Sequence, residues 1–221
     1  MSSEIDLCNL ALAHLGEDAT VSAIDPPEGS AQAEHCARFY PMARRAVLQM
    51  HTWSCNTQRE SLALLSDTPP AGWGYAYAVP SLCLKPVAVY TPEQVDNFDL
   101  LAGDVVSQDV GDFNTQDFIV ERLSTGAKVI YTNVEDATLM YLIDVVDTTK
   151  FDPLLELAIA RLLASFLAGP VIKGTEGMKV SGAQRKFFLE VELPDAKKAD
   201  TTARQSAPYS TATPAPIKAR E

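Results

Sequence analysis

The stretch GSAQAEHCARFYPMARRAVLQMHTWSCN, from Gly29 to Asn56, constrains the fold of the whole chain. Its apolar residues recur at steps of three and four, the spacing that lines one face of a helix. The residues on this face are Ala33, Cys36, Ala37, Tyr40, Ala43, Val47 and Met50. With Ser30 as an N-cap, the pattern predicts a long amphipathic helix. Mostly strand-like segments follow it, so this helix must pack against helices more than a hundred residues away.

Two residues within this stretch carry separate expectations. Pro41 lacks an N–H and its ring clashes with the preceding turn, at a cost of about 3 kcal/mol. We therefore expect a kink between Ala37 and Pro41, or two helices in sequence. Trp53 lies where the chain turns toward the strands, and we expect Trp53 and Tyr40 to be structural anchors of the core.

A shorter helix precedes this stretch. Ser3-Glu4-Ile5-Asp6 is a capping box, and Gly16 is suited to the residue after the helix, so we expect the helix to end at Leu15. The segment Asp25-Pro26-Pro27-Glu28-Gly29 then forms a loop, because its prolines and glycine favour turns.

The middle of the chain has the pattern of strands. Short runs rich in Val, Tyr and Leu are separated by Gly and Pro, which is typical of strands and turns. The predicted strands are Tyr75–Val79, Leu82–Tyr90, Phe118–Leu123, Lys128–Thr132 and Leu139–Val146. Ser124-Thr125-Gly126 joins the third and fourth of these runs as a hairpin. We expect the acidic stretch Asp104–Asp117 to be a mobile loop or a weak edge strand.

Two further helices are predicted after the strands. Asp152 and Pro153 form an N-cap and first-residue pair, and the helix they start reaches Ala168, where Gly169-Pro170 closes it. It is apolar nearly all round, so it belongs at the centre of a helical cluster. The last helix covers 177–193, with Pro194 kinking or ending it. Its predicted inward residues are Val180, Ala183, Phe187, Phe188 and Val191.

The order of these elements predicts an α+β fold, in which an antiparallel β domain is inserted into a helical bundle body. The predicted boundaries are 1–55 and 150–200 for the body and 56–149 for the β domain. Residues 201–221 are rich in Ser, Thr, Ala and Pro and are predicted to be a flexible C-terminal tail.

Composition limits the classes of partner. The chain has 221 residues and a formal charge of −11, which argues against tight non-specific binding to DNA or to an anionic membrane. No basic, apolar N-terminus resembles a signal peptide. The most apolar run, Leu154–Ala168, is shorter than a membrane span and is interrupted by Glu156 and Arg161. These features favour a protein that is made in a cytosol.

No catalytic motif is present in the sequence, which has no glycine-rich phosphate loop, no GxSxG and no HExxH. We therefore predict no catalytic, cofactor-binding or metal-binding residues. A zinc site from Cys8, His14, His35 and Cys36 is conceivable, but the spacing fits no known finger.

Other charged and titratable residues have ordinary explanations. The histidines, including His51, suit surface or cap positions. The pairs Asp144/Asp147 and Glu135/Asp136 could act as acid and base in glycoside hydrolysis, but a solvated strand edge is favoured.

Arg44 and Arg45 stand together on the long helix. An exposed arginine pair usually belongs to a solvated face, where charge pairs contribute little. One of the two could also fold back toward core carboxylates. The alternative that we retain for their role is a contact between subunits, because arginine is enriched at interfaces.

The order of several short motifs resembles one known family, the tail tubular protein A family of bacteriophages, whose members join the portal to the tail in short-tailed phages. The similarity covers nearly all of residues 1–200. The motifs that carry it are His14-Leu15-Gly16-Glu17, Tyr40-Pro41, Arg44-Arg45, Leu48, Trp53, the run GWGYAYAVPS at 72–81, Cys83-Leu84, Tyr131, Asp136-Ala137, Tyr141, Phe151-Asp152-Pro153 and Ala160.

This resemblance implies a structural role without catalysis, in a ring that typically has twelve copies. The ring would dock beneath the portal protein with a tail nozzle below it, and genome DNA would pass through its lumen without sequence-specific binding. It also implies that the C-terminal segment orders against the portal. The expected portal contacts are Tyr209, Ile217, Lys218 and Arg220. Such a protein belongs to the neck of the virion and has no membrane partner.

Two alternatives remain open on the sequence alone. One is a different neck or head-completion connector protein, such as that of a long-tailed phage. The other is a virion-associated hydrolase.

Overall fold

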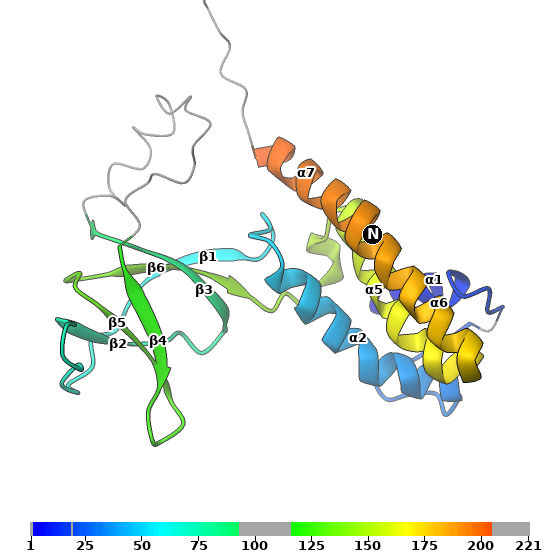
Figure 1. Cartoon of the computed structure of the whole chain (residues 1–221), viewed down its shortest axis with the longest axis horizontal. Coiled ribbons are helices and arrows are strands. Elements are labelled where there is room, and N and C mark those ends of the chain that lie inside the picture. The colour runs from blue at the N-terminus through cyan, green and yellow to red at the C-terminus, as the bar shows by residue number, and fades with distance from the viewer. Residues whose placement is uncertain (1, 19, 93–115, 205–221) are drawn as a thin grey trace, which may run out of the picture.

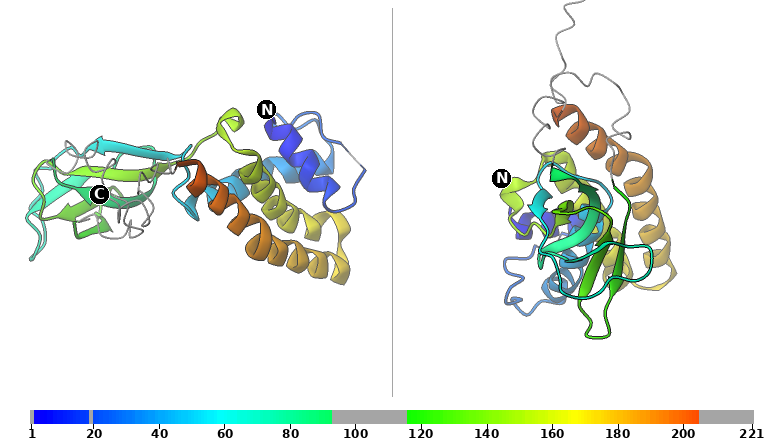
Figure 2. Two further views of the ribbon diagram at one scale, coloured as in Figure 1. Left: turned by 90° about the horizontal axis from the view of Figure 1, so that it is seen from above. Right: turned by 90° about the vertical axis from the view of Figure 1, so that its left-hand side faces the viewer.

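The computed structural model describes residues 2–18, 20–92 and 116–204. Within them the chain folds as a helical body and an antiparallel β domain, which lie at opposite ends of an elongated molecule (Figures 1 and 2). The first helices and the last helices form the body together, with the strands inserted between them. The predicted α+β class is therefore confirmed.

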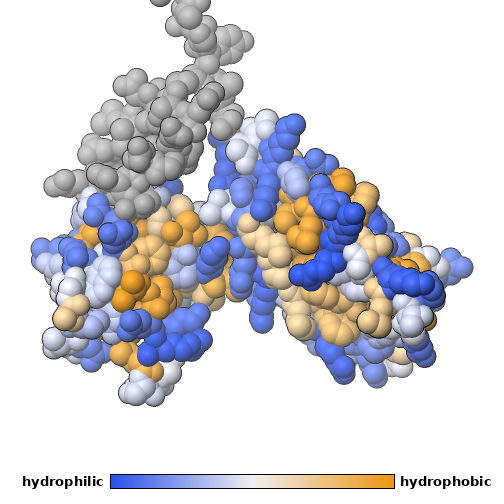
Figure 3. Space-filling model, in the orientation of Figure 1, coloured by the Kyte–Doolittle hydropathy of each residue, from blue (hydrophilic) through white to orange (hydrophobic). Residues whose placement is uncertain are grey.

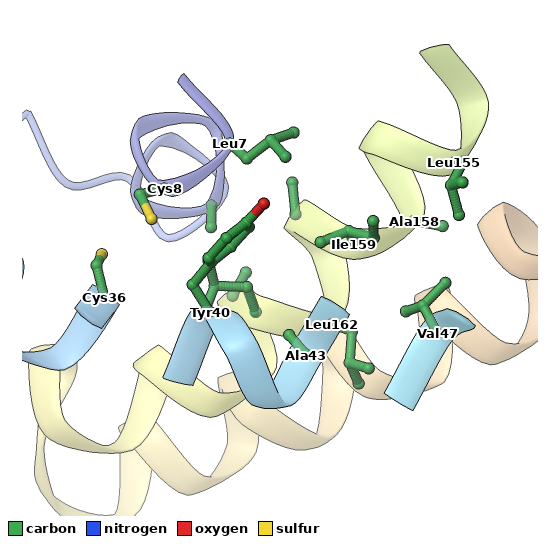
Figure 4. Packing of buried hydrophobic residues seen from close by; sticks show 14 of the residues in the cluster. Leu7, Cys8, Cys36, Tyr40, Ala43, Val47, Leu155, Ala158, Ile159 and Leu162 are labelled. Carbon is green, nitrogen blue, oxygen red and sulfur yellow. The ribbon is translucent and has the colours of Figure 1, made fainter. Parts of the chain in front are cut away.

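The body is built around one central helix, α5 (Pro153–Ile172). It contacts α1 (Glu4–Ala13), α2 (Ala31–Gln49), α6 (Gly174–Phe187) and α7 (Leu193–Arg204). Figure 4 shows how α1, α2 and α5 share this core, with the Tyr40 ring of α2 lying between α1 and α5. A central apolar helix surrounded by others is what the sequence predicts for this segment.

Helix α1 begins and ends as the sequence indicates. The Ser3 hydroxyl accepts a hydrogen bond from the Asp6 N–H, and the Asp6 carboxylate accepts one from the Ser3 N–H, which completes the capping box. At the other end, Gly16 has φ +75° and its N–H bonds the carbonyl of Ala13, while Glu17 N–H bonds that of Leu12. These two bonds form a Schellman motif, in which glycine at the left-handed position avoids a Cβ penalty.

Helix α2 runs without interruption through Pro41, so the alternative of two separate helices is wrong. Ser30 caps its N-terminus as predicted. The predicted inward face is buried at Ala33, Cys36, Tyr40, Ala43 and Val47, but Met50 is exposed. The helix ends at Gln49, because its last carbonyls bond to side chains from outside the helix, as described below.

Helix α5 continues past Gly169-Pro170, where the sequence predicted its end. Pro170 lies in the last turn, so it removes only one backbone hydrogen bond there. The helix stops at Lys173, whose φ of +63° leaves the helical region. By length and composition α5 could cross a membrane, whereas the sequence predicted a run that is too short to do so. In the structure 56% of its most apolar window is buried inside the body.

The last helical segment differs most from the prediction. It starts at Gly174, passes through a π-helical turn η2 (Phe188–Glu192) and continues as α7 to Arg204. The wider π turn comes directly before Pro194, where a tight α turn would meet the proline ring. Helix α7 thus includes the first residues of the predicted tail, while 205–221 lie outside the described residues.

The predicted inward face of this segment is confirmed at Phe188 and is otherwise wrong. Phe188 is buried, but Phe187 and Val191 are exposed, Ala183 is exposed and Val180 is only partly buried. The residues that face the core are Gly177, Phe188, Leu193, Ala196 and Asp200. The close approach of α5 decides this choice: a Cβ on Gly177 would lie 2.8 Å from the Ala168 carbonyl oxygen.

The β domain consists of two three-stranded antiparallel sheets among the described residues. One has the order β1 (Thr57–Ser61), β6 (Thr138–Ile143), β3 (Cys83–Tyr90). The other has the order β2 (Tyr75–Ala78), β5 (Lys128–Thr132), β4 (Phe118–Arg122). Side chains from both sheets fill a common core that includes Tyr77, Val89, Ile130 and Leu139.

The predicted strands and the hairpin after β4 are confirmed. Strand β1 was not predicted, since the polar sequence TQRES has no apolar alternation and lies almost fully exposed at a sheet edge. Of the stretch Asp104–Asp117, only Gln116 and Asp117 are described. Gln116 donates its N–H to the Val89 carbonyl at 3.0 Å.

Candidate functional site at the domain junction

The chain passes twice between the body and the β domain, after α2 and after β6. Polar side chains gather at both crossings, and they come from α2, β3, the end of β6 and α7. We define the joint as these polar contacts. It consists of three sets, each of which ties a different part of the chain to the C-terminal half of α2 or to the loop that follows it.

The first set is an ion cluster between α2 and the residue after β6. The Arg44 guanidinium donates to both carboxylate oxygens of Asp144, through Nε and Nη2, at 3.1 Å each. Arg45 Nε donates to the same carboxylate at 2.7 Å. Glu4 of α1 lies 3.7 Å from Arg44, whose charge also sits over the Tyr40 ring. One carboxylate therefore fixes the end of β6 against two successive arginines.

Burial makes this cluster asymmetric. Arg44 is only 5% exposed, whereas the Arg45 side chain is 58% exposed. Burial by itself would raise the pKa of Asp144, but hydrogen bonds from Arg44 and Arg45 outweigh it and leave that pKa below its usual value. Burial also opposes the charge of Arg44, yet its bonds to Asp144 raise its pKa. Both groups are held in their charged forms by each other.

The second set satisfies the last carbonyls of α2. Trp53 Nε1 donates to the Val47 carbonyl at 3.0 Å, and Asn56 Nδ2 donates to that of Leu48 at 2.9 Å. Lys85 of β3 reaches the Gln49 carbonyl at 3.3 Å, where a cation also complements the helix dipole. The last four carbonyls of an α-helix lack the regular partner one turn ahead, and here side chains fill that role, with the Met50 N–H as a further donor to the Val47 carbonyl. The end of α2 is thus capped by the start of the β domain.

The third set ties α7 to the loop after α2. Asp200 is 2% exposed and accepts a hydrogen bond from the Ser54 N–H at 2.8 Å. Its other oxygen lies 3.2 Å from His51 Nε2 and 2.9 Å from the Arg204 guanidinium, without hydrogen-bond geometry to either. Arg204 also donates to the Thr52 carbonyl. A single buried carboxylate therefore connects the C-terminal end of the body to the crossing.

The surroundings of His51 favour its neutral form, because its pKa is lowered in the folded chain. Burial lowers its pKa, and the nearby cations Arg204 and Lys197 lower it further, while Asp200 opposes them. The imidazole also packs edge-on against the Trp53 ring, with centroids 4.9 Å apart. The attraction of Asp200 for a proton on His51 is outweighed by burial and the two cations, so the folded state takes up a proton at this site less readily than the unfolded chain.

The structure corrects the prediction for one arginine of the pair. Arg44 is not on a solvated face, and because it is buried within the chain it is not available to a second subunit. For Arg45, which is exposed, the subunit contact remains a prediction. Tyr40 and Trp53 are both 1% exposed and lie in the core of the body. The expected portal contacts Tyr209, Ile217, Lys218 and Arg220 lie outside the described residues.

The acidic pairs considered for hydrolysis are used in other ways. Asp144 belongs to the ion cluster, so the description as a solvated strand edge is wrong for it. Asp147 accepts bonds from the N–H and hydroxyl of Thr149 and caps the short helix η1 (Thr148–Lys150). Glu135 and Asp136 lie in the exposed turn before β6.

The conceivable zinc ligands only partly meet. Cys8 and Cys36 face each other in the core (Figure 4), and a hydrogen bond between the thiols raises the pKa of Cys8 and lowers that of Cys36. In the part of the chain that the structure describes, no group of three or more His, Cys, Asp or Glu side chains could hold a metal ion.

Sequence reasoning missed Asp144, Asn56 and Asp200 as joint residues. A signal did exist for Asp200, since it follows Leu193 and Ala196 at helical spacing and so falls on the buried row of α7. For Asp144, a single carboxylate between Ile143 and Val145 in an apolar strand end was the available hint. Asn56 carries no comparable pattern.

Comparisons with known proteins give no independent identification. No protein-family model matches the chain, and no curated protein matches it.

Proposed function

We propose that this protein is a structural component of a bacteriophage particle, a head-to-tail adaptor that forms a ring between the portal and the tail. The ring is a homo-oligomer, for which the resemblance implies twelve copies, and it carries genome DNA through its lumen without catalysis. The protein is made in the host cytoplasm and ends in the neck of the virion.

The observation that carries this proposal is the joint. A ring between two large assemblies transmits force, and each subunit must hold its parts in one relative position. Here Asp144 after β6 and Lys85 of β3 bind α2 and so tie the β domain to the helical body, while Trp53 and Asp200 hold the loop at the crossing against the body. Because hydrogen bonds and ion pairs are directional, they favour one orientation of the two parts over others.

Two features of the sequence support the same proposal. The motif series that resembles tail tubular protein A spans both the body and the β domain, and it includes Arg44, Arg45 and Trp53 of the joint. The net charge of −11 also suits a conduit wall, because a wall rich in Lys and Arg would retain DNA by binding its phosphates.

The test is deletion of the gene from the phage genome that encodes it, followed by electron microscopy of the particles. We expect DNA-filled heads without tails, and tailed particles again when the protein is supplied from a plasmid. Normal tailed particles from the deletion would refute the adaptor. Release of soluble fragments from purified cell walls by the protein would instead favour a virion-associated hydrolase.

A further inference from the structure

One side of the helical body carries an apolar groove that the described part of the chain leaves open. It measures about 390 Å³ and lies between α2, α5 and α6. Its lining residues are Phe39, Ser165, Phe166, Gly169, Met178 and Ser181. Met178 at its mouth is 75% exposed, and Leu189, three turns further along, is 46% exposed. Figure 3 shows apolar surface over α2 and in the angle between it and α6.

A second apolar feature lies on the other flank of α6. We call it the ridge and define it as Phe187 and Val191, which are 45% and 40% exposed. Phe187 lies nine positions after Met178. At about 100° per residue this is two and a half turns, so the two side chains point to opposite sides of the helix. At Phe187 the ridge lies near the end of α1, since the neighbouring Gln184 donates to the His14 carbonyl. Arg161 of α5 packs over the Phe187 ring and is paired with Glu192.

The two features have surroundings of opposite charge. Beside the ridge, Glu17 and Asp18 follow the end of α1, and residues 1–37 contain no Lys or Arg. Beside the groove, Lys173 ends α5, and Arg185 lies two turns along α6 from Met178; both are exposed. Arg161 beside the ridge is paired with Glu192, and Glu176 beside the groove is paired with Lys179. With these pairs set aside, Glu17 and Asp18 make the ridge border acidic, and Lys173 and Arg185 make the groove border basic.

We infer that the ridge of one copy of the chain docks into the groove of the next copy. The occupant is a second copy because each body carries both members of the pair, with apolar centres and complementary charged borders. Methionine suits such a groove, since its flexible thioether adapts to the shape of a docked side chain.

The geometry of this contact follows from its two different surfaces. A contact between unlike faces is head-to-tail, and it repeats until a ring closes. The inference rests on the proposed function, because the proposed ring is what brings a second copy to each face. It adds the residues that make the contact, and it places them on α2, α5 and α6 rather than on Arg44.

The test uses two variants that each destroy one side of the contact. Met178→Glu puts a charge in the groove, and Val191→Glu puts one on the ridge. Lys179→Gln is the matched control, because Lys179 is 72% exposed on the outward side of α6 between the two flanks. All three positions are exposed, so the circular dichroism spectrum and thermal midpoint should match those of the wild type.

Sedimentation velocity of the full chain over a range of concentrations measures the association. We expect the wild type and Lys179→Gln to associate into large species, and each glutamate variant to associate at least about tenfold more weakly, since a charge is costly in an apolar contact. An equimolar mixture of the two variants should form dimers and nothing larger, because the one intact ridge and the one intact groove meet within the dimer and its two outer faces carry the substitutions.

Association of either glutamate variant like the wild type would overturn the inference, and so would a mixture that stays monomeric. A wild type that is monomeric up to about 1 mM, the limit of a contact worth about 4 kcal/mol, would overturn it as well. These results are independent of the deletion experiment. If the deletion gives tailless particles while the glutamate variants associate like the wild type, the adaptor function holds and this contact is refuted. If the deletion gives normal tailed particles, the adaptor function is refuted and the contact between copies is judged by sedimentation alone.

Discussion

Asp144→Asn is the substitution that tests the joint most directly. It keeps the size of the side chain and one oxygen acceptor, but it removes the charge that faces Arg44 and Arg45. Arg44 would then remain as a buried cation, 5% exposed, with Glu4 at 3.7 Å as its remaining anionic neighbour in the cluster. The amide's own N–H groups would also point at guanidinium donors.

The magnitude follows from burial. Removing one partner of a fully buried ion pair costs about 3–5 kcal/mol, because the other charge is left uncompensated. The Asp144 side chain is 21% exposed, so solvent screens part of this effect, and we expect a loss of about 2–3 kcal/mol in the free energy of unfolding. For a chain of this length that corresponds to a fall of about 5–10 °C in thermal midpoint.

Urea unfolding followed by circular dichroism measures this loss, and Arg45→Ala is the matched control. Arg45 shares the same carboxylate, but its side chain is 58% exposed, so its removal should cost only about 0–1 kcal/mol. Because the joint couples the body to the β domain, Asp144→Asn should also broaden or split the unfolding transition. Tryptophan fluorescence and circular dichroism would then report different midpoints.

The pH dependence gives a second readout of the same group. The pKa of Asp144 is lowered in the folded protein, so its charge stabilises the fold at pH values above the ordinary value of about 4. This contribution is lost as the pH falls through the lowered pKa. Asp144→Asn should therefore remove part of the decline in stability on acidification. A loss below about 0.5 kcal/mol at pH 7, or an equal loss in Arg45→Ala, would refute the reasoning.

Further predictions concern the core, the third contact set, metal and the tail. Trp53→Ala should cost about 3–5 kcal/mol in urea unfolding, because the side chain is 1% exposed; unchanged stability would mean that Trp53 is no anchor. The lowered pKa of His51 means that the unfolded chain binds a proton first, so stability should fall as the pH drops below about 6.5, and His51→Gln should flatten that slope if the assignment is right. A chelator should leave the thermal midpoint unchanged, and a fall that zinc reverses would reinstate Cys8, His14, His35 and Cys36 as ligands. Truncation after Arg204 should preserve the circular dichroism spectrum but abolish co-sedimentation with the portal protein, because Tyr209, Ile217, Lys218 and Arg220 are removed; equal binding would place the portal contact on the rest of the chain.

Local patterns were sufficient for many elements. The capping box at Ser3, the glycine at position 16 and the hairpin through Gly126 each depend on residues within a few positions, so their chemistry is visible in the sequence. The inward face of α2 was also predictable, because five of its seven predicted residues are buried at helical spacing. In these places local propensity and tertiary packing agree.

The last helical segment shows where this approach fails. Its apolar residues predict a face through Phe187 and Val191, yet the close approach of α5 at Gly177 turns another face inward. The π turn before Pro194 then shifts the phase of everything that follows. The first effect comes from another helix packed against this segment, and the second from a change of helix type that the spacing of apolar residues does not reveal. The apolar residues left outside are the ridge.

The joint could not be predicted for a similar reason, and this bears on how it works. Arg44 and Asp144 are one hundred residues apart, and Ser54 and Asp200 are 146 apart, so no pattern along the chain links them. A purely apolar contact between body and β domain would tolerate sliding, because the hydrophobic effect has no preferred direction. Buried polar groups tolerate much less, since a small displacement of the end of β6 leaves Arg44 without its carboxylate partner Asp144, at a cost of several kcal/mol. The same contacts that add little net stability therefore give every copy of the chain the same orientation of its two parts, which a closed ring of identical subunits requires.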